Sequence, residues 1–282
     1  MELVNEIVEA RNFWEAWMSV RRNQGAAGID KMSVEALDEY MPLHMDEIKQ
    51  SICRKQYKPS PVRRVFIPKP NGKVRPLGIP TVVDRVVQQA TAQVLSRIYE
   101  PLFSDHSYGF RPNRSCHQAI NQALEYLNEG YEWVVDFDIE KYFDTVNHDK
   151  LISILREQVN DSATLHLVRS FLKSGVMENG LISATIEGVP QGGCISPILS
   201  NIYLDKLDKE LESRELRFVR YADDFDIFVK SERSADRVMA SVSRWLESKL
   251  RLKVSATKTK VVRPTKSVFL GFTGPKVRIF YK

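Results

Sequence analysis

Tyr221-Ala222-Asp223-Asp224 is the stretch that decides the fold of this chain. It separates two segments with strand character, 216–220 and 225–229, and in the second of them alternate residues are apolar, at the period of a strand. We therefore expect a tight hairpin with two adjacent carboxylates at its tip. Such a turn normally contains glycine, because it requires positive φ. A solvated loop would explain the Asp-Asp pair. The absence of the usual glycine from the turn, however, also indicates a functional site. A divalent cation bound there would relieve the repulsion between the two carboxylates.

A second strand, 133–139, also ends in acidic residues. Two-metal phosphoryl transfer uses carboxylates from separate strands to hold two Mg²⁺ ions about 4 Å apart. We expect Asp138 and Asp223 to meet on neighbouring antiparallel strands, where one ion would activate a nucleic-acid 3′-hydroxyl and the other would stabilise the leaving pyrophosphate. Strand alternation does not choose between Asp138 and Asp136, because both face the same side.

The two acidic segments belong to a series of motifs that follow one another in a fixed order along the chain. They are 67–80 (IPKPNGKVRPLGIP), 107–115 (SYGFRPNRS), 138–144 (DIEKYFD), 188–193 (GVPQGG), 221–224 (YADD) and 269–272 (FLGF). With these motifs the chain resembles a reverse transcriptase, and in particular the bacterial group II intron-encoded type. The resemblance extends from about residue 25 to residue 272.

The resemblance implies an α+β fold, a right-hand polymerase with fingers and a palm that contains an antiparallel sheet. Residues 1–60 would form an N-terminal extension of the fingers with a template-clamp loop, 61–130 the fingers, and 131–282 the palm. In the family a helical thumb follows, and only ten residues follow Phe272 here. We therefore expect a fingers and palm portion of a longer protein, with RNA affinity reduced by the missing phosphate contacts.

The implied activity is RNA-directed DNA synthesis with two Mg²⁺ ions, for which Mn²⁺ would substitute. Asp138 and Asp223 would be the main metal ligands, with Asp224 auxiliary and the backbone carbonyl of Ile139 as a further ligand. Lys258 would lie near the pyrophosphate as a general acid, although a solvent-facing lysine is the ordinary alternative. The family usually has Asn where Ser255 stands, so no hydrogen bond is inferred at that position.

A basic hairpin, 63–79, is predicted around the turn Asn71-Gly72. It is either a solvated ribbon or a lid over phosphates, since guanidinium and ammonium groups both suit phosphate oxygens. By resemblance, Lys69 and Arg75 would grip the triphosphate of the incoming nucleotide. Phe143 would exclude a ribose 2′-hydroxyl, and Gln191 would contact the sugar and the template pair.

Other basic residues are candidates for template or primer contact. In the loop 21–28 Arg21 and Arg22 are candidate phosphate ligands, with a plain connector as the alternative. Arg111 and Arg114 would contact template phosphates or pair with Asp105, and the two alternatives stay open. The full set of candidates for template or primer contact is Arg21, Arg22, Arg63, Arg111, Arg114 and Gly271.

Composition agrees with this interpretation. The chain has 282 residues, 43% of them hydrophobic, which excludes general disorder and allows a sizeable core. A net charge of +5 fits either plain solubility or a polyanionic partner. Cys53, Cys116 and Cys194 have no zinc-like spacing and are expected to be free thiols. No membrane-length apolar run is present, so a bacterial cytoplasmic protein is expected.

The expected partners are template and intron RNA, a DNA primer and deoxynucleoside triphosphates, with a homodimer left open. Two alternatives to the polymerase remain: an RNA-binding maturase module with weak catalysis, and a reverse transcriptase of another bacterial retroelement. Local patterns predict one amphipathic helix over the first 20 or so residues, a second from Ser33, a third capped by Thr81, and others from Ser196 and over 235–250.

Overall fold

The computed structural model describes residues 2–68, 72 and 74–273. They form two compact units, Met1–Pro101 with Val146–Leu199, and Leu102–Thr145 with Ser200–Lys282. These units are built from separated stretches of chain, whereas the expected division at residues 60 and 130 is contiguous. The assignment of a template-clamp extension, fingers and palm to particular ranges stays a prediction.

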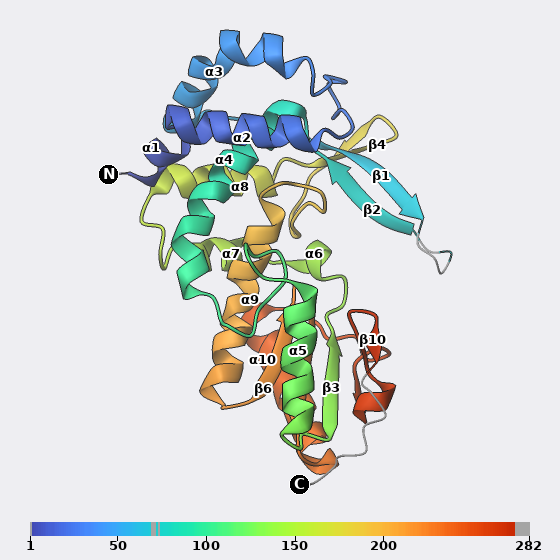
Figure 1. Cartoon of the computed structure of the whole chain (residues 1–282). Helices are drawn as coiled ribbons and strands as arrows, with labels where there is room; N and C mark the ends of the chain where they lie inside the picture. Colours follow the sequence, from blue (N-terminus) through green and yellow to red (C-terminus); the bar gives the residue numbers. More distant parts are fainter. Residues whose placement is uncertain (1, 69–71, 73, 274–282) are drawn as a thin grey trace. The chain divides into compact units, whose positions relative to one another are not determined.

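The first unit is rich in helices. They are α1 (Leu3–Ile7), α2 (Ala10–Asn23), α3 (Leu37–Cys53), α4 (Val82–Tyr99), α7 (His148–Leu155) and α8 (Ser162–Leu172), with the 3-10 turn η1 (Glu100–Leu102) at the boundary. The Thr81 cap is confirmed, because the Thr81 hydroxyl accepts a hydrogen bond from the Asp84 N–H at 3.1 Å. Figure 1 shows α2 lying alongside α4, and the two pack closely.

Two helix predictions in this unit are wrong. The first 20 residues form two helices, because Asn12 donates from Nδ2 to the carbonyl oxygens of Ile7 and Ala90 and so provides the end of α1 with a side-chain partner. The second long helix begins at Leu37, not near Ser33, since the Ser33 hydroxyl accepts from the Ala36 N–H and closes a separate turn.

The predicted basic hairpin is confirmed as part of a four-stranded sheet. Its strands β1 (Val62–Pro68) and β2 (Val74–Ile79) are antiparallel, with Arg63 opposite Ile79 and Pro68 opposite Val74. The strands β4 (Val176–Glu178) and β5 (Leu181–Ser183) complete the order β2-β1-β4-β5, in which β4 is parallel to β1. The turn residues Lys69 and Asn71 lie outside the described residues.

The second unit contains the antiparallel palm sheet that the sequence predicts. Its strands are β3 (Trp133–Asp138), β6 (Arg217–Tyr221), β7 (Asp224–Val229) and β8 (Lys260–Val262), in the order β6-β7-β3-β8. Figure 1 shows α5 (Cys116–Asn128) running alongside β3, and α5 residues join one buried cluster with Val134 and Phe228. Burial of this apolar face holds the sheet against the helix.

Shorter elements complete the second unit. They are α6 (Tyr142–Thr145), α10 (Glu232–Trp245), the π-helix η2 (Leu246–Leu250), η3 (Pro264–Lys266), and the two-stranded ribbon of β9 (Val268–Phe269) with β10 (Phe272–Thr273). The helix α9 (Ser196–Ser213) begins in the first unit and ends in the second. All three cysteines are free thiols, as predicted. Among the described helices, none combines the length and the apolar character that crossing a membrane requires.

Candidate active site

The acidic tetrapeptide forms the predicted hairpin tip. Tyr221 ends β6 and Asp224 begins β7, and the two residues face each other across a turn made of Ala222 and Asp223. Ala222 has a φ of +59°, in the left-handed region that a tight hairpin demands and that glycine usually supplies. A side chain in this region is strained, so contacts from elsewhere must hold the turn.

One group of contacts comes from Arg220, which is completely buried. Its guanidinium donates to both carboxylate oxygens of Asp208, at 2.7 and 2.6 Å, and to Asn201 Oδ1 at 3.1 Å. It also donates to the carbonyl oxygen of Ala222 at 2.7 Å. Because a bidentate pair fixes both partners in orientation, Arg220 connects the acidic turn to α9.

A second contact is the close approach of Gly109. A Cβ atom added to Gly109 would lie 2.3 Å from the Ala222 nitrogen, so only glycine fits. The Gly109 carbonyl accepts from Asn201 Nδ2 at 2.9 Å, and the neighbouring Tyr108 N–H donates to the Arg220 carbonyl at 2.9 Å. The motif 107–115 therefore supports the backbone of the acidic turn from its side.

The acids themselves lie in two rows across the palm sheet. Asp138 is opposite Asp224, and Asp136 is opposite Asp226, so all four side chains share one face. Lys258, in the turn before β8, has its Nζ 2.8 Å from Asp138 Oδ2, and on β8 itself Lys260 Nζ lies 3.2 Å from Asp136 Oδ2. The β3 residue expected to meet Asp223 is thus registered against Asp224, while Asp223 lies in the turn beside it.

The row nearer the turn carries excess negative charge. Burial is the main cause that raises the pKa of Asp224 to about 7, and the charges of Asp136, Asp223 and Asp138 act in the same direction. Within the described residues no three His, Cys, Asp or Glu side chains already enclose a metal position. The donor set nonetheless fits Mg²⁺, because this cation prefers carboxylate oxygens and its charge would compensate the repulsion at Asp224.

The row farther from the turn is more deeply buried. Asp226 is 3% exposed, and burial raises the pKa of its carboxyl well above the ordinary value, with the charges of Asp136 and Asp224 acting in the same direction. The Ser267 hydroxyl donates to Asp226 Oδ2 at 3.3 Å. Burial therefore disfavours the charged form of Asp226, and its hydrogen bond to Ser267 joins β7 to the residue before β9.

The backbone of Asp138 is also fixed. Its N–H donates to Thr259 Oγ1 at 3.1 Å, and its carbonyl accepts from the Ser255 N–H at 2.8 Å. The next residue, Ile139, is buried and bridges to Val254. These contacts bring the segment 254–259 to the end of β3, which is how Lys258 reaches Asp138.

Two predicted nucleotide-binding residues meet in the first unit. Arg75 Nε donates to Gln191 Oε1 at 3.0 Å, and the Gly78 N–H donates to the Gln191 carbonyl at 2.7 Å. Lys69 lies outside the described residues. Phe143 belongs to the second unit, on α6, where its ring meets that of the buried Tyr142 edge to face.

The predicted template residues have mixed environments. Arg21 pairs with Asp38 at 2.7 Å, and Arg22 is exposed. Arg63 donates twice to the carbonyl of Ala27, at 3.0 and 2.7 Å, and so holds the basic loop in place.

The loop and turn residues among these candidates are also accounted for. Arg111 is buried and donates to the carbonyl oxygens of Ser104 and Ser107. Arg114 pairs with Asp105 at 2.6 Å, one of the two alternatives that the sequence left open. Gly271, with a φ of +78°, forms the turn between β9 and β10.

Several residues that support the acids were not predicted from the sequence. These are Lys260, Asp226, Arg220, Asp208 and Asn201. A signal existed for two of them, because Arg220 and Asp226 are charged residues with apolar or aromatic neighbours on both sides in their strands. Their partners lie on other elements, and strand alternation alone does not identify them.

Comparisons with known proteins agree with this geometry. Residues 67–274 match the family described as reverse transcriptase (RNA-dependent DNA polymerase). Protein YkfC of Escherichia coli is 35% identical over 86% of this chain and 74% of its own length. The group II intron-encoded protein LtrA of Lactococcus lactis is 39% identical over 74% of this chain, which spans only 35% of LtrA.

A solved structure supports the fold alone. Telomerase from Candida tropicalis, in complex with a fragment of telomeric RNA, matches 86% of this chain and 47% of its own length with a TM-score of 0.58 at 15% identity. At that identity the likeness extends to the arrangement of helices and strands.

Proposed function

Because the chain belongs to the reverse transcriptase (RNA-dependent DNA polymerase) family, and to its group II intron-encoded type, we propose that it adds deoxynucleotides to a primer on an RNA template. The observation that carries the proposal is the row Lys258–Asp138–Asp224 beside the turn that contains Asp223. Carboxylates from two strands and one lysine are gathered on one face of the sheet, at the end next to the acidic turn.

We propose that Asp138, Asp223 and Asp224, with the carbonyl of Ile139, hold two Mg²⁺ ions. When bound, the ions would increase the acidity of the primer 3′-hydroxyl and neutralise charge on the leaving pyrophosphate. Lys258 Nζ lies 2.8 Å from Asp138 Oδ2, and we assign to Lys258 the protonation of the leaving group. Arg220 and Gly109 position the turn and contact no substrate.

The nucleotide would be held by Lys69, Arg75, Gln191 and Phe143. The Arg75 guanidinium offers a planar donor fork that suits phosphate oxygens, and its hydrogen bond to Gln191 orients it before the nucleotide binds. Phe143 would occupy the space of a ribose 2′-hydroxyl and so restrict the product to DNA.

For the template and primer, we propose direct phosphate contacts by the exposed Arg22, and by Arg21 and Arg114 on exchanging their Asp38 and Asp105 partners for phosphate, with backbone approach at Gly271. Arg63 and Arg111 would act through the loops that they hold, because their guanidinium groups already donate to backbone carbonyls. In the full-length protein we propose a second role as a maturase that binds intron RNA, on the strength of the 39% identity to LtrA.

The test is primer extension on an annealed RNA template with Mg²⁺ and deoxynucleotides, comparing wild type with Asp223→Ala. We expect a loss of about 10³-fold in extension rate, because removal of a metal ligand forfeits several kcal/mol of charge stabilisation. RNA binding, measured by fluorescence anisotropy, should stay near the wild-type value.

Asp236→Ala is the matched control, because Asp236 is an exposed acid on α10 outside the acidic rows. It should extend primers at the wild-type rate. Full activity of Asp223→Ala would overturn the assignment of the catalytic centre. Loss of extension together with loss of RNA binding would show a folding defect and not a catalytic one.

A further inference from the structure

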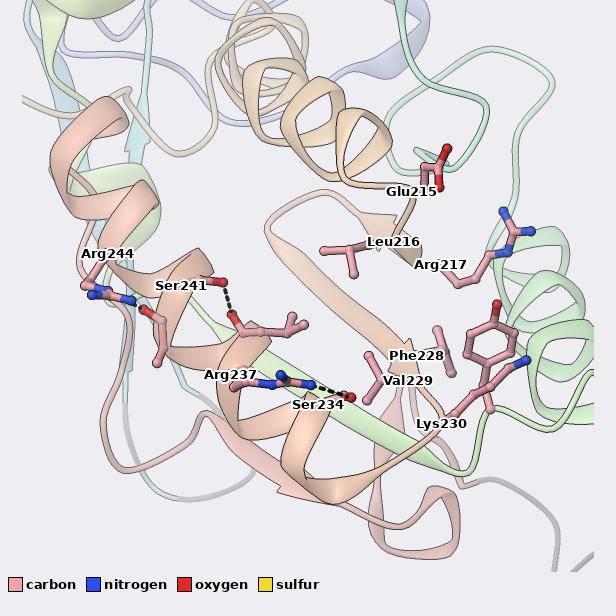
Figure 2. Close-up of a pocket in the computed structure, with 13 residues that line it drawn as sticks. Glu215, Leu216, Arg217, Phe228, Val229, Lys230, Ser234, Arg237, Ser241 and Arg244 are labelled. Carbon is pink, nitrogen blue, oxygen red and sulfur yellow. Dashed lines mark hydrogen bonds between the residues drawn. The ribbon is translucent and has the colours of Figure 1, made fainter.

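A groove of about 730 Å³ lies within the second unit, at the end of the palm sheet opposite to the acidic turn. It is lined by the start of β6, the end of β7 and one side of α10. Figure 2 shows Arg237 and Arg244 on the α10 wall, and Arg217 and Lys230 on the facing wall. No residue of the proposed polymerase centre lines it.

The groove is strongly cationic. Arg217, Lys230, Arg237 and Arg244 are exposed along it, and Glu215 is the single acid among its lining residues. In the part of the chain that the structure describes, no salt bridge joins any of these four cations to a carboxylate. Arginines nearby are neutralised, since Arg214 pairs with Glu210 and Arg263 with Glu132, each at 2.6 Å.

The α10 wall has a regular spacing. Ser234, Arg237, Ser241 and Arg244 follow one another at intervals of three and four residues, so they form one stripe along the helix. Seven residues separate Arg237 from Arg244, which is about 10.5 Å along the helix axis. Each strand of duplex DNA carries one phosphate roughly every 3.4 Å of the helix axis, so at a comparable phosphate spacing the two guanidinium groups would span about three nucleotides.

The remaining lining residues favour a nucleic-acid strand over an acidic protein segment. Arginine, lysine, serine and tyrosine are the side chains that usually contact phosphate and sugar, and Tyr131 adds an aromatic ring to the wall that carries Lys230. Among the apolar lining residues, Phe228 is 3% exposed and Val229 6%, whereas Leu216 and Val238 are half-buried.

From these observations we propose that the groove binds the sugar–phosphate backbone of an RNA strand, as a second RNA site apart from the polymerase centre. Recognition is independent of base sequence, because the cations and hydroxyls along the groove would contact phosphates and sugars and not the bases. The site would hold RNA that extends beyond the segment being copied.

The experiment measures the salt dependence of binding of a short unprimed single-stranded RNA of mixed sequence to the full chain. The test variant is Arg237→Gln/Arg244→Gln, since glutamine removes the charge and retains helix propensity. Removing one cation that neutralises a phosphate should reduce the slope of log K against log salt by about 0.7, so we expect a decrease of about 1.4 for the double variant. The control is Arg233→Gln/Lys249→Gln, which removes the same charge from exposed positions outside the groove.

A slope change confined to the groove variant supports the site, and circular dichroism on both variants checks that each is folded. A change no larger than that of the control overturns the proposal. In that case, weaker binding of a poly-glutamate peptide by the groove variant would assign the groove to an acidic protein. The experiment measures RNA binding and not DNA synthesis. The proposal for the groove is therefore tested independently of the Asp223→Ala result.

Discussion

Asp224 illustrates, at the scale of one residue, the conflict between stability and the proposed chemistry. Its carboxyl lies among Asp136, Asp138 and Asp223, and burial together with those charges raises its pKa to about 7. A carboxyl that is ionised with difficulty destabilises the folded state at neutral pH, and a bound cation would remove that penalty. Without a bound cation, the carboxylates around Asp224 therefore repel one another in the folded state.

The pH dependence follows from the sign of this shift. The folded pKa of about 7 exceeds the ordinary value of 3.8, so between these pH values the folded state binds more protons than the unfolded state. The contribution of Asp224 to stability therefore decreases as pH rises from about 4 to about 7 and is constant above. Without Mg²⁺ we expect Asp224→Asn to unfold at higher urea concentration than wild type at pH 8, by roughly 1–3 kcal/mol, and to differ little at pH 4.

Adding Mg²⁺ provides the internal check. Ligand binding to the folded state stabilises it by mass action, so Mg²⁺ should raise the thermal midpoint of wild type more than that of Asp224→Asn. An equal response of the two proteins, or a gain for Asp224→Asn that persists unchanged at pH 4, would contradict the explanation.

Arg220 is a second case at the residue scale. Removing one partner of a buried ion pair leaves the other charge uncompensated, at a cost of about 3–5 kcal/mol. We expect Arg220→Met to lose that much stability in urea unfolding, whereas Arg217→Met, at an exposed position of the same strand, should lose little.

The double variant Arg220→Met/Asp208→Leu separates stability from positioning. It removes both charges, so most of the stability should return. Primer extension should stay low, because no donor then holds the Ala222 carbonyl. If extension recovers along with stability, Arg220 serves the fold alone.

At the scale of elements, the hairpin β6–β7 depends on the loop that contains Gly109. We expect Gly109→Ala to displace the acidic turn, because the new Cβ would lie 2.3 Å from the Ala222 nitrogen. Extension should decrease at least about tenfold, a loss of about 1.4 kcal/mol in transition-state stabilisation, while RNA binding is retained. Asp105→Ala alters the same loop at an exposed side chain and should leave extension unchanged.

The elements that the sequence predicted correctly are those with local signals. The Thr81 cap, the basic hairpin and the alternation along β7 each depend on residues close together in the chain. The break between α1 and α2 was missed because it depends on Asn12 and a carbonyl of α4. The sequence near Asn12 does not indicate a partner as distant as the Ala90 carbonyl.

The candidate site divides in the same way. The motif resemblance predicted Asp138, Asp223 and Asp224 as metal ligands, which stays a prediction, and the structure shows Asp138 opposite Asp224 in the register of β3 and β7. The pairing of Arg220 with Asp208 depends on the packing of β6 against α9, and the hydrogen bond of Asp226 depends on Ser267, the residue after η3. Sequence spacing does not predict these contacts, although charged residues between apolar or aromatic neighbours were a visible signal.

At the scale of the whole molecule, the two units are interleaved along the chain. The second unit receives β3 from the segment Leu102–Thr145, and its other sheet strands from the segment after residue 200. The chain completes the first unit at Leu199, between these two contributions. Neither unit corresponds to one continuous piece of sequence.

This order has a consequence during synthesis on the ribosome. β3 emerges long before β7 and β8, so Trp133–Asp138 must wait as an unpaired, largely apolar strand while some eighty-five further residues are translated. Unpaired strand edges promote aggregation, and charges within them oppose it. Asp136 and Asp138 interrupt this strand at alternate positions.

We therefore expect nascent chains stalled after Leu199 to sediment more when Asp136 and Asp138 are both changed to Asn than when Asp144 and Asp149, outside β3, are changed in the same way. Equal sedimentation would contradict this. The carboxylates of β3 would then have two roles: during synthesis they would oppose self-association of the unpaired strand, and in the folded protein they would belong to the acidic rows of the palm sheet.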